Sequence, residues 1–166
     1  ATIVLIWADT GTNEMSDVEL SSAVTLQVIL TTGPNGSRGA GVSVDYSGVL
    51  SSLVVIGYMS TPGGGLPIML GTTSDTGSRV ENINSASIPP HVGSGLSSAG
   101  QTHQLGTVTF QVSQLPSGTL QIRSDANGPT DDVFDFDGNT ITSTTTFNSA
   151  YLSIDGTFPT PTPTAI

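Results

Sequence analysis

Apolar and polar residues alternate with a period of two along most of this 166-residue chain, and no stretch carries the repeat of an amphipathic helix. Residues 24–30, 40–46 and 105–112 alternate in this way, and residues 53–59 form an almost continuous apolar run. Gly, Pro and Asn separate the runs, for example at residues 33–36. Because side chains of a strand point alternately to its two faces, each run predicts a strand with one buried face. Short strands at this spacing predict an all-β fold, namely a two-sheet antiparallel β-sandwich of the immunoglobulin-like or jelly-roll type, with about seven to ten strands.

Length and punctuation predict one domain, residues 1–157, followed by a Thr- and Pro-rich tail, residues 158–166. A chain of this length can bury a sizeable core without covalent cross-links. Cysteine is absent, which excludes disulfides, zinc–thiolate sites and thiol nucleophiles. No run approaches the roughly 20 apolar residues that a membrane-spanning helix needs.

The first predicted strand differs from the others because it is apolar on both faces. Its five central residues are Ile3, Val4, Leu5, Ile6 and Trp7. A strand of this kind is expected to be covered from both sides, either in the middle of its own fold or by another molecule. A strand that adds to the open sheet edge of a neighbour gains backbone hydrogen bonds. We therefore predict that these five residues form an assembly strand between copies of the chain, with a central strand of the chain's own sandwich as the alternative.

Charge restricts the partners of this chain. It has three Arg, no Lys and thirteen acidic residues, which give a formal net charge of −10. A field of this sign repels phosphate backbones, so nucleic acid is excluded as a partner. Charged residues make up only 10% of the chain and Ser, Thr and Gly fill the polar positions, as in many extracellular β proteins. We expect an exported protein at the cell surface whose signal peptide has been removed ahead of Ala1.

Acidic residues gather in residues 125–139 and suggest a calcium site. Calcium takes six to eight oxygen ligands, and alternate residues of a tight loop can point their side chains at one ion. Neighbouring carboxylates also repel one another unless water or a cation neutralises them. The candidate ligands are Asp125, Asn127, Asp131, Asp132, Asp135, Asp137 and Asn139. A solvated loop of Asx turns, in which Asp and Asn bind nearby backbone N–H groups, is the alternative.

Residues 105–112, 134–139 and 147–150 together resemble the cohesin-like β-sandwich of many bacterial extracellular and surface proteins. The Pro-rich exit, residues 158–164, is similar to that of exosortase-sorted proteins of the PEP-CTERM type, although Thr stands where their sorting signal has Glu. The resemblance implies a sandwich that binds proteins and acts at the cell surface. Cohesins proper bind dockerin modules, but the motifs carry over no dockerin-contact residue.

Catalytic groups are sparse. Ser43 lies inside a predicted strand, whereas the serine of a nucleophile elbow precedes a helix. The two histidines, His91 and His103, lie in or next to an irregular region rich in Ser and Gly. A glycan platform would need exposed aromatic residues, and the candidates are Trp7, Tyr46, Tyr58 and Tyr151.

Together these features predict a non-catalytic structural or adhesive surface protein. We expect it to assemble with copies of itself into a filament, sheath or layer by strand pairing. The alternative is a calcium-dependent module that binds another surface protein or a surface glycan.

Overall fold

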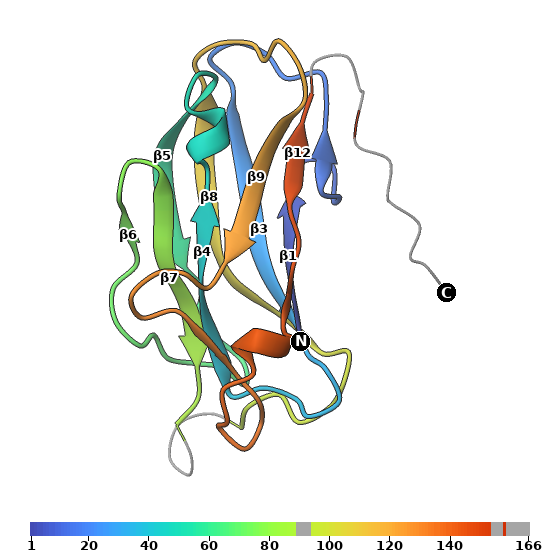
Figure 1. The fold of residues 1–166 in the computed structure, drawn as a ribbon, viewed down its shortest axis with the longest axis vertical. Coiled ribbons are helices and arrows are strands. Elements are labelled where there is room, and N and C mark those ends of the chain that lie inside the picture. The colour runs from blue at the N-terminus through green and yellow to red at the C-terminus, as the bar shows by residue number, and fades with distance from the viewer. Residues whose placement is uncertain (89–93, 154–157, 159–166) are drawn as a thin grey trace.

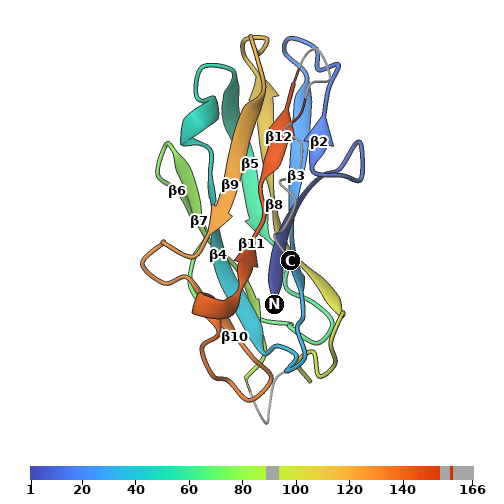
Figure 2. The ribbon, with the colours of Figure 1, turned by 45° about the vertical axis from the view of Figure 1, so that its right-hand side comes forward.

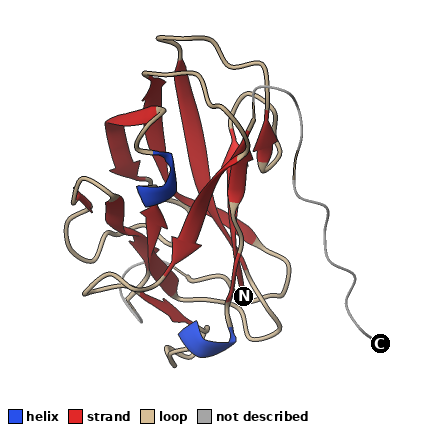
Figure 3. Ribbon diagram, turned by 45° about the horizontal axis from the view of Figure 1, so that its top comes forward, coloured by secondary structure: helices blue, strands red, loops and turns tan. Residues whose placement is uncertain are grey.

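The computed structural model describes residues 1–88, 94–153 and 158, which form two β-sheets packed face to face (Figure 1). Among these residues, helix is confined to two short 3₁₀ turns, η1 and η2 (Figure 3). The elements in chain order are β1 (Thr2–Trp7), β2 (Glu14–Met15), β3 (Ala23–Thr31), β4 (Gly39–Asp45), η1 (Ser47–Val49), β5 (Leu53–Ser60), β6 (Ser74–Asp75), β7 (Arg79–Ala86), β8 (Thr102–Val112), β9 (Leu120–Asp125), β10 (Asp132–Phe134), η2 (Thr142–Thr144), β11 (Thr146–Phe147) and β12 (Ala150–Leu152).

The first sheet, called sheet A, has the strand order β11-β1-β3-β8-β5. The second, called sheet B, has the order β2-β12-β9-β4-β7-β6, with β10 beside β4. This arrangement confirms the predicted all-β, two-sheet sandwich. Most pairs are antiparallel, but β1 pairs with β11 and β2 pairs with β12 in parallel. The sheets are therefore mixed rather than purely antiparallel, because β11 runs parallel to β1 in sheet A and β12 runs parallel to β2 in sheet B (Figure 2).

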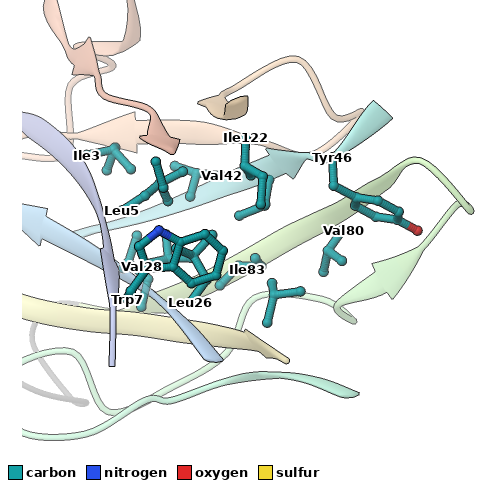
Figure 4. Close-up of a cluster of buried hydrophobic side chains, with 14 of the residues drawn as sticks. Ile3, Leu5, Trp7, Leu26, Val28, Val42, Tyr46, Val80, Ile83 and Ile122 are labelled. Atoms are coloured by element: carbon teal, nitrogen blue, oxygen red, sulfur yellow. The ribbon is translucent and has the colours of Figure 1, made fainter. Parts of the chain in front are cut away.

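The core lies between the inner faces of the two sheets. In Figure 4, Trp7 and Leu26 of sheet A face Val42 and Ile83 of sheet B, and all four side chains are fully buried. The Trp7 ring packs edge-to-face on Phe110, with centroids 6.5 Å apart. The indole N–H of Trp7 also donates a hydrogen bond of 2.9 Å to the Tyr151 carbonyl, which ties β1 to β12 of the opposite sheet. Trp7 therefore anchors both sheets.

The first strand is covered by its own chain. β1 pairs with β3 along its whole length and with β11 at its start. Ile3, Leu5 and Trp7 are 0% exposed in the core, whereas Val4 and Ile6 are half-buried on the outer face. The strand thus lies within the chain's own sandwich, as the alternative predicted, and its outer face is only partly covered. Assembly through residues 3–7 stays a prediction. The apolar outer side of β1 is part of a larger surface, because none of the five strands of sheet A contains a charged residue.

Several predicted boundaries shift. Strand β7 forms from residue 79, and residues 66–70 contribute only two isolated bridges, Leu66 with Gly63 and Ile68 with Ala86. The strands β2, β6 and β10 have two or three residues each and were not predicted. The predicted end of the domain, 154–157, and the tail from 159 onward lie outside the described residues. Within the described part of the chain, no helix has the length and apolar character to cross a membrane.

Candidate functional site

The carboxylates of the acidic segment 125–139 do not converge on one point. Asp125 ends β9 and accepts two hydrogen bonds from the guanidinium of Arg79 on β7, at 2.8 and 2.5 Å. Asn127 is exposed, and its backbone N–H donates a hydrogen bond of 2.9 Å to the Asp125 carboxylate. Asp125 is therefore occupied by an ion pair.

Asp131 bridges two strands of sheet B. One of its carboxylate oxygens accepts hydrogen bonds from the Ser43 hydroxyl on β4 and from the Gly128 N–H at 2.8 Å. The other accepts the backbone N–H of Asn82 on β7 at 3.2 Å. Asn82 adopts a positive φ of 54°, which favours Asn, Asp and Gly. Asp131 therefore fixes the loop before β10 onto the outer face of sheet B.

The last carboxylates serve the turn after β10. Asp132 accepts hydrogen bonds from the hydroxyls of Thr140 and Thr142. Asp135 is 7% exposed and accepts the N–H groups of Asn139 at 2.8 Å and Asp137 at 3.0 Å. These bonds, that from Asn139 first, hold the pKa of the Asp135 carboxyl below its usual value. This is the Asx-turn arrangement that the sequence left open as the alternative.

The seven predicted calcium ligands thus fall into separate groups, in which the carboxylates of Asp125, Asp131, Asp132 and Asp135 accept hydrogen bonds from the protein itself. In residues 1–88 and 94–153, no group of three or more His, Cys, Asp or Glu side chains is arranged to hold a metal ion. Calcium binding therefore stays a prediction.

A charged network covers the upper outer face of sheet B. Its centre is Arg79, which binds Asp125 and lies 3.6 Å from carboxylate oxygens of both Asp45 and Glu81. The hydrogen bond to Asp125 raises the pKa of the Arg79 guanidinium above its usual value. Sequence reasoning missed this network because its members come from β4, β7 and β9, which are distant along the chain.

The structure does not bring the candidate serine and histidine together. Ser43 lies on β4 in sheet B and donates to Asp131, whereas His103 lies on β8 in sheet A. The Nε2 atom of His103 is buried with no hydrogen-bond partner among the described residues, and burial lowers the pKa of this histidine. His91 lies outside the described residues.

The four candidate aromatic residues do not form a glycan platform. Trp7 and Tyr46 are core residues, at 0% and 3% exposure. The Tyr46 hydroxyl donates to Asp75, and burial together with this bond raises its pKa above the usual value. Tyr58 is 41% exposed on β5, and Tyr151 is half-buried on β12 in the other sheet.

The outer face of sheet A is the surface that sequence reasoning did not identify. The five strands of this sheet contain no Asp, Glu, Lys or Arg. The register pairs Thr25 with Thr109 and Gln27 with Thr107 at the centre of this surface, and the two hydroxyls of the first pair are 3.1 Å apart. We call it the uncharged face; its outward residues are Val4, Ile6, Thr25, Gln27, Ile29, Val54, Ile56, Met59, Thr107, Thr109 and Gln111. The signal that could have found it is the absence of charge from four separate strand runs.

No protein-family model matches the sequence, and no curated protein matches it either. Solved structures of cohesins are similar in fold. CaCohA2 from Clostridium acetobutylicum, solved in a complex, has a TM-score of 0.61 and 11% identity, covering 92% of this chain and 98% of that one. The third cohesin of ScaC from Acetivibrio cellulolyticus, in complex with the ScaB dockerin, has a TM-score of 0.59, 10% identity, and coverage of 92% and 97%.

A type II cohesin from Bacteroides cellulosolvens has a TM-score of 0.58 and 13% identity, with coverage of 93% and 99%. At identities this low, the likeness establishes the fold. It confirms the predicted cohesin-like β-sandwich, and the match extends over nearly the full length of each neighbour.

Proposed function

We propose that this chain is an exported, non-catalytic module that binds another protein through the uncharged face of sheet A. One observation carries the proposal: a chain with a net charge of −10 has one whole sheet without a charged residue. The cores of protein–protein interfaces are depleted of charged side chains, and an exposed apolar patch on a soluble domain marks an interaction site. The uncharged face has both properties.

The two outer faces differ in whether their side chains already have partners within the molecule. On sheet B, the Arg79 guanidinium donates to Asp125, and Asp131 accepts a hydrogen bond from the Asn82 N–H. These polar groups already have partners within the molecule. On the uncharged face, Val54, Ile56 and Met59 are 49%, 54% and 57% exposed. Burial of such side chains by a partner stabilises a complex by roughly 25 cal/mol per Å² of apolar surface before the costs of association are subtracted.

The remaining parts of the proposal have separate support. Ser43 is bonded to Asp131 and lies in the other sheet from His103, which supports a role without acyl transfer. Two of the similar structures are complexes, one of them with a dockerin, which supports a protein as the partner. The Ser-, Thr- and Gly-rich composition and the Pro-rich tail support a structural or adhesive role outside the cell or on its surface.

A comparison of matched lysine variants tests the proposal. Gln27→Lys/Gln111→Lys adds two positive charges to the uncharged face, and Thr72→Lys/Ser74→Lys adds two at exposed residues of and next to β6 in sheet B. Each variant and the unaltered chain are immobilised and exposed to an extract of secreted and surface proteins, and retained proteins are identified by mass spectrometry. We expect a protein retained by the unaltered chain to be lost only with the sheet A variant. Retention by that variant, or loss only with the sheet B variant, would contradict the proposal.

A further inference from the structure

The strand β5 forms the open edge of sheet A. It is the last strand in the sheet order and pairs only with β8. Four of its side chains are large, apolar and exposed, namely Val54, Ile56, Tyr58 and Met59. No other strand of the structure exposes more than one large apolar side chain to this degree, so the feature belongs to β5 specifically.

Backbone hydrogen-bonding groups on β5 point away from the sheet. Val112 on β8 accepts from the Ser21 N–H and donates to the Ser22 carbonyl, so both its backbone groups face β3. Successive residues of a strand direct these groups to opposite sides, so Gln111 faces its register partner Val54 on β5. The next residue of β5, Val55, consequently turns its N–H and C=O outward. In the described part of the chain no hydrogen bond beyond the sheet reaches Val55.

Protection against edge pairing is weak on this strand. Natural sheet edges are blocked by Lys, by Pro, by very short strands or by bulges. β5 has eight residues, no charged residue and no Pro, and its one irregularity is a register shift between Val55 and Gly57. A Cβ atom on Gly57 would meet nothing within 4 Å, so no other atoms cover the face of the sheet at this residue.

We infer that β5 pairs antiparallel with β5 of a second copy of this chain, so that the two A sheets join into one continuous sheet. The inference goes beyond the proposed function, since the contact is made by the edge of sheet A and leaves the uncharged face open to another protein. Two chains of net charge −10 repel each other, and sheet A is where they can approach without placing acidic residues in contact. A two-fold pairing of one strand with itself is self-complementary, and it places uncharged side chains opposite each other.

The inferred assembly contact is made by β5, whereas the sequence predicted an assembly contact at residues 3–7. Residues 3–7 lie within the chain's own sandwich, whereas β5 supplies an unpaired edge. A two-fold contact closes into a dimer and not a filament, because the same edge is used by both copies. A filament or layer would need a second, different contact in addition.

Sedimentation equilibrium of matched variants tests the inference. Val54→Lys/Ile56→Lys places like charges opposite each other in the pair, and Leu20→Lys/Leu115→Lys makes a similar change in charge and apolarity at exposed loop residues outside β5. We expect the unaltered chain and the control to dimerise, and the β5 variant to dimerise at least about tenfold more weakly. Raising the salt from about 0.05 M to about 0.5 M should strengthen the dimer by screening the repulsion between the two copies.

A monomeric unaltered chain up to millimolar concentration overturns the inference, and so does equal weakening in both variants. Circular dichroism of each variant confirms that the sandwich is intact, and hydrogen exchange should show protection of β5 amides on dimerisation. The proposed function can survive such a failure, because it is tested by retention of a different protein on the uncharged face.

Discussion

The two sheets of this sandwich bury similar apolar inner faces but present different outer faces to solvent. Their inner faces are alike, with Val28 and Leu5 of sheet A packed among the same core residues as Val42 and Ile122 of sheet B. Their outer faces differ because every Asp, Glu and Arg within a strand belongs to sheet B. Polar groups on sheet B are used to hold the molecule together, whereas the uncharged face of sheet A remains available for a partner. The comparison shows that burial pattern and surface chemistry are set independently on the two sides of a strand.

Trp7 on the inner side of β1 should be far more important for stability than Val4 on its outer side. Trp7→Ala removes a fully buried ring and its bond to Tyr151, and we expect it to lower the free energy of unfolding by about 3–5 kcal/mol. Val4→Ala changes a half-buried side chain and should cost less than about 1.5 kcal/mol. Urea denaturation followed by circular dichroism measures both. Similar losses for the two variants would mean that β1 is covered on both sides after all.

Arg79 on sheet B should contribute more than any polar side chain on the uncharged face. Arg79→Ala leaves Asp45, Glu81 and Asp125 close together without their cation, and we expect a loss of about 1–3 kcal/mol in the free energy of unfolding, reduced by added salt. Gln27→Ala on sheet A should change it by less than about 0.5 kcal/mol. Equal effects would contradict the assignment of a structural network to sheet B and a free surface to sheet A.

His103, on β8 of sheet A, should make the stability of the folded chain depend on pH. Burial lowers its pKa in the folded chain, so below pH about 6.5 the unfolded chain binds more protons than the folded one. Stability contributed by the neutral ring is therefore present above that pH and is lost as the pH falls toward the folded pKa. We expect the melting temperature of the unaltered chain to drop more than that of His103→Gln between pH 7.5 and 5.5. Parallel curves for the two proteins would exclude this role.

Calcium should have the smallest effect of all. Because the carboxylates of Asp125, Asp131 and Asp135 already accept hydrogen bonds from the protein, we expect calcium to change the melting temperature by less than about 1 °C relative to a chelator. Differential scanning calorimetry measures this shift. A calcium-dependent rise of several degrees, abolished by Asp137→Asn, would instead support the predicted site.

Features that depend on neighbouring residues could be predicted from the sequence, whereas features that depend on contacts between distant residues could not. The runs around Val24, Val42 and Val108 indicated their strands correctly, because alternation along a single strand is a local property. The two-residue strand β6 carried no such signal, since it exists only through its pairing with β7. The acidic segment illustrates the same limit, because its spacing alone could not show that Arg79 and Ser43 on other strands donate hydrogen bonds to Asp125 and Asp131.

The amino-acid sequence by itself determined that the chain is a two-sheet sandwich with a cohesin-like pattern, since side-chain periodicity decides which face of each strand avoids water. Only the tertiary structure decided which strands became neighbours. It enclosed β1 within its own chain and left β5 at an open edge, although residues 3–7 and 53–59 are almost equally apolar in sequence. The physical reason is that an edge is a property of the sheet order, and the sheet order depends on contacts between residues far apart along the chain.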